Sequence, residues 1–192
     1  MNLSTPTHPI TLPSLSPDIR LHGKVSDDML GEFFRQQADV EPGRPVVLEL
    51  STSGGDADVG RRIAQEIRLW QMQTGCELFF LGKTFVYSAG ITIMSGFLKS
   101  HRFLTADCEL LIHERKLKKD IHLDGALRGC LSAVNDVLAQ IESGQRLEKQ
   151  GFEQLVKGSS LSAQALIDKV YTKDWYLSAD EALAHGLVQG LV

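Results

Sequence analysis

The sequence contains few cysteines. Cys76, Cys108 and Cys130 are the only three in 192 residues, and no two of them have C-x-x-C spacing. An odd, scattered set of this kind is typical of reduced thiols and not of a disulfide framework. The cysteine usage therefore predicts a cytoplasmic protein.

Long apolar runs and excess positive charge are missing as well. No stretch approaches the length of a membrane span, and residues 1–17 lack the basic start and apolar core of a signal peptide. The formal net charge is −4, so charge gives no case for nucleic acid or an anionic membrane as a partner. The Pro, Ser and Thr content of residues 1–17 predicts an extended or poorly ordered arm, followed by a single domain over 18–192.

What the sequence does contain is an alternation of short apolar runs with amphipathic stretches. It predicts strands within 18–25, 45–51, 76–82, 101–105 and 108–113, and helices over 26–38, 58–72, 89–100, 125–150, 159–171 and 178–186. The strand, glycine turn, helix and strand of residues 45–82 form a βαβ unit, which implies a parallel pair. The fold class is therefore α/β, with a helical excursion between about 125 and 170.

Helical periodicity also assigns faces to two of these helices. In the first helix, which Ser26 is expected to cap, Met29, Phe33 and Phe34 fall on one side. In the long helix, one apolar stripe comprises Leu127, Leu131, Val134, Leu138 and Ile141. The last helix has the capping box of Ser178 with Glu181 three residues later.

Candidate residues for serine acyl transfer lie at the ends of predicted strands and the starts of predicted helices. This chemistry needs a nucleophile, a base, a group that orients the base, and donors for the oxyanion. Ser88 lies where a turn between a strand and a helix enters that helix, so the free amides and the dipole of the helix face it. His113 ends a strand, Asp174 precedes the last helix, and Gly54–Gly55 follow a strand. Taken singly, each also has an ordinary structural explanation as a turn, strand-end or loop residue.

Familiar catalytic motifs are absent around these residues. Val86 stands where a G-x-S-x-G motif has its first glycine, and the chain order Ser, His, Asp differs from that of the common serine hydrolases. The spacings of His101, Cys108, His113 and His122 match no compact zinc motif, so we expect no metal site.

Four longer segments occur in a fixed order between about Ile19 and the C-terminus. They are LELSTSGGDADVGRRIAQEI, KTFVYSAGITIMSG, CELLIHE and TKDWYLSADEALAHGLVQGLV. Together they resemble the turn, nucleophile, histidine and closing segments of the Clp protease proteolytic subunit (ClpP) family, within the wider ClpP/crotonase superfamily. The resemblance implies a ClpP/crotonase-like fold of repeated ββα units.

The resemblance also implies roles for individual residues. Ser88 aligns with the nucleophile, His113 with the general base and Asp174 with the carboxylate that orients it. The oxyanion donors would be the backbone amides of Gly55 and Ala89, with Gly54 in the supporting turn. The implied activity is a serine endopeptidase that needs no cofactor and cleaves peptides or unfolded proteins, inside a ring-shaped homo-oligomer.

Three features depart from the family pattern. Ser53 replaces the proline of the family's SPGG turn, ERKLKKDIHLDG replaces the glycine-rich stretch after His113, and the residues before Ile19 do not resemble the family's N-terminal loop. A basic run pairs poorly with a copy of itself, so we expect altered assembly, and a AAA+ ATPase partner stays open. Two alternatives remain: a non-catalytic Clp-like assembly subunit, and a crotonase-like acyl-CoA enzyme that uses carboxylates in place of a serine.

Overall fold

The chain forms a mostly parallel β-sheet with helices packed on it. A computed structural model describes residues 11–171 and 173–192. The strands are β1 (Ile19–His22), β2 (Val46–Thr52), β3 (Leu78–Tyr87), β4 (Arg102–Leu104), β5 (Glu109–Ile112), β6 (Trp175–Ser178) and β7 (Gly190–Leu191). The helices are α1 (Asp27–Ala38), α2 (Ala57–Thr74), α3 (Ala89–Met94), α4 (Leu127–Val156), α5 (Ala163–Val170) and α6 (Ala179–Ala184), with a 3-10 turn at Lys99–His101. The α/β class predicted from the sequence is confirmed.

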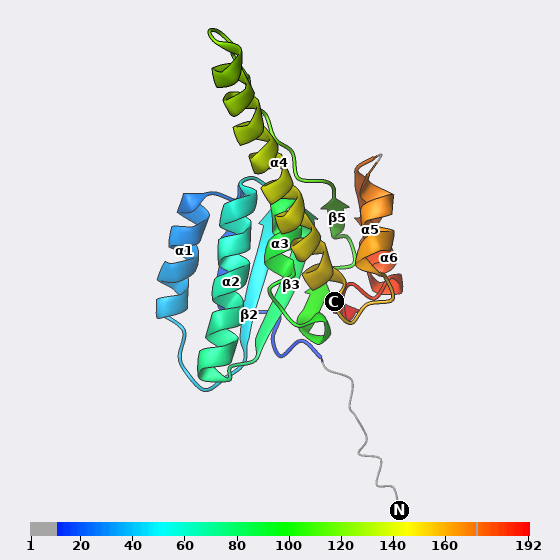
Figure 1. Ribbon diagram of the computed structural model, residues 1–192. Helices are drawn as coiled ribbons and strands as arrows, with labels where there is room; N and C mark the ends of the chain where they lie inside the picture. The colour runs from blue at the N-terminus through cyan, green and yellow to red at the C-terminus, as the bar shows by residue number, and fades with distance from the viewer. Residues whose placement is uncertain (1–10, 172) are drawn as a thin grey trace, which may run out of the picture.

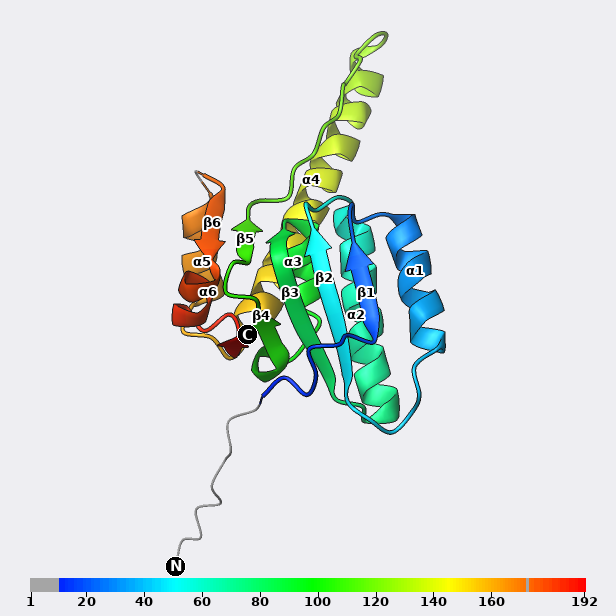
Figure 2. The ribbon, with the colours of Figure 1, turned by 180° about the vertical axis from the view of Figure 1, so that it is seen from behind.

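The strands of the sheet follow the order β1-β2-β3-β4-β7, and β5 extends it by pairing with β3 and β6. All pairs are parallel except β5 with β6. Figure 1 shows α1, α2 and α3 in front of the sheet, and Figure 2 shows β1, β2 and β3 from the opposite side. The helices therefore cover one face of this part of the sheet.

The predicted βαβ unit is formed by β2, α2 and β3. Val46 of β2 lies opposite Leu78 of β3 in parallel register. Ile63 and Ile67 of α2 are fully buried, as the helical period predicts. Asp56 caps α2, because its side chain accepts hydrogen bonds from two backbone amides of the first turn.

Strand β3 is longer than predicted and continues to Tyr87. Its first half pairs with β4 and its second half with β5. Because parallel strands end at the same edge of a sheet, Ser88 after β3 and His113 after β5 come to neighbouring positions. The extension of β3 is therefore what places the candidate nucleophile beside the candidate base.

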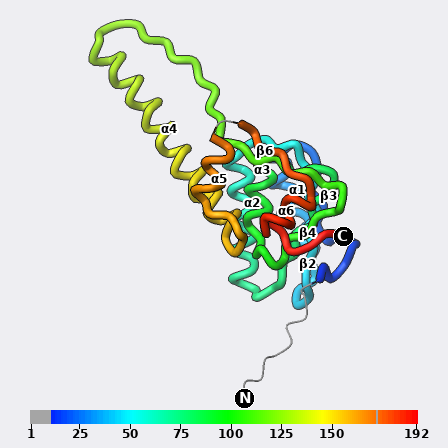
Figure 3. The backbone as a smooth tube through the Cα atoms, turned by 90° about the vertical axis from the view of Figure 1, so that its right-hand side faces the viewer, coloured from blue at the N-terminus to red at the C-terminus, as the bar shows by residue number. Residues whose placement is uncertain are grey.

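Helix α4 supplies the predicted helical excursion, and its first half projects away from the body of the molecule (Figures 1 and 3). The apolar stripe of this half is exposed, from 87% at Leu127 and 61% at Leu131 to 42% at Ile141. Only the last turns carry buried side chains, including Phe152 and Leu155. Periodicity identifies an apolar face but not what covers it, and within the described residues much of this face stays exposed.

Two details of α1 differ from the prediction. Ser26 occupies the N-cap position, but its side chain makes no capping hydrogen bond. Met29 and Phe33 are buried, whereas Phe34 is 39% exposed, so Phe34 does not share the buried side with the other two as predicted. Adjacent helical residues are turned by about 100°, which is enough to bring Phe34 to the solvent. The capping box of Ser178 with Glu181 is confirmed in α6.

The predicted N-terminal arm is only partly within the described structure. Residues 1–10 lie outside the described residues, and residues 11–17 form no helix or strand. Among the helices of the described chain, none combines the length and the apolar character needed to cross a membrane.

Candidate active site

Ser88 occupies a strained turn between β3 and α3. Its φ of 54° and ψ of −113° lie in a region that residues with a Cβ rarely adopt, at a cost of about 1–3 kcal/mol. The backbone amide of Ser88 donates a hydrogen bond of 2.8 Å to the carbonyl of Leu111 in β5. The turn is thereby fixed to the strand that leads to His113. Strain of this kind is common where a catalytic side chain must be presented at a sharp strand-to-helix turn.

Gly54 makes room for this turn. A Cβ on Gly54 would lie 2.8 Å from the Cβ of Ser88 and 3.1 Å from the carbonyl oxygen of Tyr87. The turn is anchored by the buried Thr52, whose Oγ1 accepts the Gly54 amide at 3.1 Å and donates to the Gly23 carbonyl at 2.6 Å. Sequence reasoning explained Gly54 by turn geometry alone, and it missed the supporting role of Thr52.

Gly55 and Ala89, whose backbone amides are the candidate oxyanion donors, line one cavity with Ser88. Within residues 11–171 and 173–192, neither amide donates to a protein acceptor. Gly60, near the start of α2, packs so closely on α3 that a Cβ would lie 2.8 Å from the Ala89 carbonyl oxygen. This close approach holds the Gly55 turn, which precedes α2, against the start of α3. Two amides without acceptors at one cavity are suited to stabilise an oxyanion.

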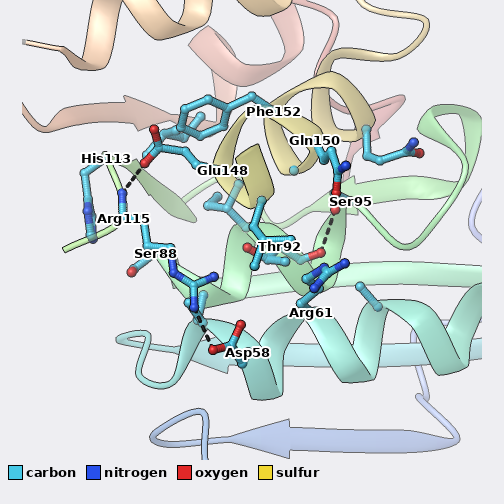
Figure 4. Close-up of a pocket in the computed structure, with 18 of the residues that line it drawn as sticks. Asp58, Arg61, Ser88, Thr92, Ser95, His113, Arg115, Glu148, Gln150 and Phe152 are labelled. Atoms are coloured by element: carbon cyan, nitrogen blue, oxygen red, sulfur yellow. Dashed lines mark hydrogen bonds and ion pairs between the residues drawn. The ribbon is translucent and has the colours of Figure 1, made fainter. Parts of the chain in front are cut away.

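A cavity of about 640 Å³ opens between α2, α3 and the end of α4. Ser88, His113, Gly55 and Ala89 all line it, so the structure brings these predicted residues to one place (Figure 4). The ring Nδ1 of His113 lies 2.5 Å from the carbonyl oxygen of Glu114. No hydrogen bond joins the side chains of Ser88 and His113 among the described residues.

Asp174 does not line this cavity. Its carboxylate lies 3.4 Å from the Nζ of Lys116. Strands β5 and β6 are antiparallel, and Trp175 lies opposite Ile112. One position farther in this register, Asp174 lies across from His113. The backbone thus brings Asp174 near His113, while its side chain is engaged by a lysine of the segment after β5.

Arg115, in that segment, is held to two helices that border the cavity. The Arg115 amide donates to the carboxylate of Glu148 on α4, and the Arg115 guanidinium pairs with Asp58 on α2 at 2.6 Å (Figure 4). Burial raises the pKa of Glu148, and the hydrogen bond from Arg115 partly offsets this effect. Sequence reasoning missed these partners, because they lie on helices far from residue 115 in the chain.

The histidine and cysteine residues considered for a metal site are separated in space. His101 is buried, stacks on Phe79 with ring centroids 4.3 Å apart, and has its Nδ1 3.2 Å from the Leu78 carbonyl oxygen. In the part of the chain that the structure describes, no three His, Cys, Asp or Glu residues form a group that could hold a metal ion.

Comparison with known proteins places this chain in a family. The sequence model of the Clp protease family matches residues 16–192. The ATP-dependent Clp protease proteolytic subunit 2 of Treponema pallidum is 26% identical over 183 residues, covering 91% of this chain and 81% of that protein. The Treponema denticola protein of the same name is 24% identical over 176 residues, covering 88% and 78%.

Comparison with solved structures shows that the fold is also similar to that of a Clp protease subunit. A mutant ClpP1 from Listeria monocytogenes superposes with a TM-score of 0.70 at 17% identity, covering 91% of this chain and 90% of that one. At this identity the likeness concerns the fold alone, and the family model carries the assignment. The chain belongs to the Clp protease family.

Proposed function

We propose that the protein is a serine endopeptidase in which Ser88 is the nucleophile. The Ser88 hydroxyl attacks a peptide carbonyl, His113 accepts its proton and then returns it to the leaving amine, and water releases the acyl-enzyme. The amides of Gly55 and Ala89 stabilise the oxyanion, a contribution worth about 10²–10³ in rate per donor. The observation that carries the proposal is the strained Ser88 in one cavity with His113 and two amides that lack acceptors. Membership of the Clp protease family supports peptidase activity.

A fluorophosphonate probe tests this assignment directly. The probe reacts with activated serines, so covalent labelling is expected at residue 88 and is read by mass spectrometry of the digested protein. His113→Ala is expected to slow labelling strongly, because the hydroxyl then lacks its base. Labelling mapped to another serine would overturn the assignment of Ser88.

In this mechanism Asp174 orients His113 after leaving Lys116. The ion pair is largely exposed, with 68% of the lysine side chain and 42% of the aspartate side chain accessible. Exposed pairs of this kind contribute at most about 1 kcal/mol, so exchanging Lys116 for His113 is a small step for Asp174. The Nδ1–H of His113 would at the same time change its acceptor from the Glu114 carbonyl to the Asp174 carboxylate.

Replacing Lys116 with glutamine is therefore expected to raise the rate of probe labelling, by up to about fivefold. The neutral side chain frees the Asp174 carboxylate without removing any group of the proposed mechanism. The measurement is the second-order labelling rate at low and high salt, and salt is expected to raise the wild-type rate more than the variant rate. Lys118→Gln, two residues on in the same exposed segment, is the matched control. A Lys116→Gln rate at or below that of this control would contradict the prediction.

Gly54→Ala is expected to reduce the labelling rate at least tenfold. The new methyl group would overlap Ser88, and the turn must shift to accommodate it. Gly43→Ala is the matched control, because Gly43 also has a positive φ (86° against 94°) but a Cβ there has no neighbour within 4 Å. Both variants bear the same kind of backbone strain, so a difference in labelling rate between them reports the contact with Ser88.

We further propose that the chain acts as a ring-forming homo-oligomer that encloses its active sites. The exposed apolar stripe on α4 supports this proposal, since surfaces of this kind mark protein interfaces. The Treponema relatives are named proteolytic subunits of an ATP-dependent protease, so an ATPase partner is included in the proposal.

Sedimentation equilibrium is expected to show an oligomer that Leu131→Ser weakens. Leu131 is 61% exposed on α4, and a serine there removes apolar area from a contact without changing the fold. The exposed Leu15, outside α4, provides the control Leu15→Ser. A monomer at micromolar concentration would argue against a compartmentalised protease.

One observation favours a second function, that of a non-catalytic assembly subunit. In the structure, Lys116 holds Asp174 and the Glu114 carbonyl holds His113, so the orienting pair is not formed. A subunit of this kind would bind peptide or an active paralogue without hydrolysis. Peptidase assays of the chain alone and mixed with an active Clp subunit separate the two functions.

A further inference from the structure

Two arginines of α2, Arg61 and Arg68, line the same cavity as Ser88. They are seven residues apart, which on an α-helix is about two turns, or roughly 10 Å, along one face. Neither guanidinium pairs with a carboxylate within residues 11–171 and 173–192. The neighbouring Arg62, in contrast, pairs with Glu66 at 2.7 Å.

The packing of α2 on α3 places these arginines relative to the reaction centre. Gly60, just before Arg61, packs against the carbonyl oxygen of Ala89, and Ala64 packs against Gly96 one turn farther on. The two helices therefore run side by side, away from the amide of Ala89. The backbone of Arg61 lies at about the level of that amide along α2. The backbone of Arg68 lies about two turns farther along the helix.

The close-up view agrees with this order. In Figure 4, Ser88, Thr92 of α3 and Arg61 follow one another across the view. A side chain that enters the cavity from a carbonyl held at Ser88 would thus run along α3 toward the guanidinium groups. The long arginine side chains can cover the remaining distance.

The positive charges of Arg61 and Arg68, on the α2 side of the cavity, favour the binding of an anion. Arg68 is half-buried, and burial together with the positive charge of Arg61 lowers the pKa of Arg68. Arg61 itself is exposed, so its charge and the partial burial of Arg68 both disfavour the charged form of Arg68. A bound carboxylate relieves both effects. On the opposite wall, the carboxylate of Glu148 already accepts the Arg115 amide, and Glu153 is exposed.

We propose that Arg61 and Arg68 form an anion subsite that selects peptides with an acidic side chain at the residue whose carbonyl Ser88 attacks. The inference rests on the proposed peptidase function and specifies its substrate class. A guanidinium presents two parallel N–H donors that match the two oxygens of a carboxylate. Glutamate and aspartate side chains provide this group, and their neutral amides do not.

The test uses four peptides that differ only at the residue before the scissile bond: Glu, Gln, Leu and Lys. For wild-type protein, kcat/KM for the Glu peptide is expected to exceed that for the Gln peptide about tenfold, since a charge-assisted pair is gained in a partly dry site. Equal rates, or a preference for Leu or Lys, would overturn the inference while leaving the peptidase function intact.

Arg61→Met and Arg68→Met test the residues themselves. Methionine keeps most of the apolar stem and removes the charge, so each change is expected to bring the Glu-to-Gln ratio close to one. Arg62→Met, one residue away on the outward face of α2, is the matched control and is expected to keep the ratio. Because both substrates are measured with the same protein sample, the ratio does not depend on how much of a variant is folded.

Binding to the Ser88→Ala protein separates the inference from the proposed function. Fluorescently labelled Glu and Gln peptides are titrated by anisotropy, and the Glu peptide is expected to bind about tenfold more tightly, an advantage lost on adding Arg68→Met. Tighter binding of the Glu peptide without cleavage by wild-type protein would support the subsite and refute the peptidase function. Equal binding of the two peptides would overturn the subsite.

Discussion

Ser88→Ala is expected to lower peptide hydrolysis by on the order of 10⁵-fold or more, because it removes the nucleophile and leaves only binding and the oxyanion donors. Alanine keeps the Cβ that the strained backbone at this position already carries, so the turn and the stability of the protein should change little. The measurement is the steady-state hydrolysis of a fluorogenic peptide, with thermal unfolding recorded on the same samples.

Ser95→Ala provides the control for this prediction. Ser95 lines the same cavity, but its hydroxyl donates at 2.7 Å to the Thr92 carbonyl within α3 and has no role in the proposed chemistry. Its replacement is expected to leave hydrolysis within about threefold of wild type. If Ser88→Ala retains wild-type hydrolysis, the mechanism proposed for Ser88 fails.

The combined variant Ser88→Ala/His113→Ala adds a sharper criterion. Residues that act as one unit show strongly non-additive effects, since the base has nothing to activate once the nucleophile is gone. The double variant should therefore be no slower than Ser88→Ala alone. If the double variant instead loses the product of the two single-variant losses in rate, His113 contributes through binding or packing.

Local patterns were sufficient to predict the elements that carry the site. The run of β2, the glycine turn and the amphipathic α2 follow from side-chain periodicity and from glycine's tolerance of positive φ. Ser88 was placed at the start of a helix and His113 at the end of a strand for the same reason. The two meet because β3 extends beyond its predicted end and pairs with β5, so that both strands end at a common edge of the sheet. This part of the prediction depends only on residues that are close together in the chain, and their pattern can be read from the sequence.

The position of the Asp174 side chain could not be predicted in this way. It depends on an ion pair with Lys116 across 58 residues, and therefore on the β5–β6 register and on the path of residues 114–116. The tether of Arg115 to Asp58 is of the same kind, with partners 57 residues apart. No periodic or local feature encodes such pairs, so the sequence resemblance implied a role for Asp174 but not its present partner.

The remaining differences concern whether a helix face is buried or exposed, and they depend on which other elements pack over that face. Periodicity assigns Arg68 to the polar face of α2, where solvent is the default neighbour, but Arg68 is half-buried in the cavity that the end of α4 borders. The reverse holds for the first half of α4, whose apolar stripe has solvent as its neighbour. A pattern reports the chemistry of a face, whereas its surroundings are decided by elements from other parts of the chain.

Arg102 was predicted only as part of a short strand, yet it is 2% exposed and central to the packing of three elements. Its guanidinium donates to the carbonyls of Phe97 at 2.9 Å, Leu155 at 2.8 Å and Leu187 at 3.3 Å. Burial lowers the pKa of Arg102 to about 10. This pKa is still well above neutral pH, so the group stays charged. The side chain thus joins the end of α4 to the turn after α3 and to the turn after α6.

Arg102→Met is expected to lower the free energy of unfolding by about 3–5 kcal/mol, because several buried carbonyls lose their donor together. The corresponding fall in melting temperature is on the order of 10 °C. Urea denaturation followed by tryptophan fluorescence measures the change, and the exposed Arg128 provides the control Arg128→Met, expected within about 0.5 kcal/mol of wild type.

Arg102→Lys distinguishes the hydrogen-bond geometry from the charge. An ammonium retains the charge but cannot present a planar fork to carbonyls from separate elements, so most of the stability loss should persist. A lysine variant as stable as wild type would show that charge alone suffices. Since Leu155 lies one turn beyond Phe152, which lines the cavity, loosening this end of α4 should also reduce peptide hydrolysis in both variants at temperatures where they remain folded.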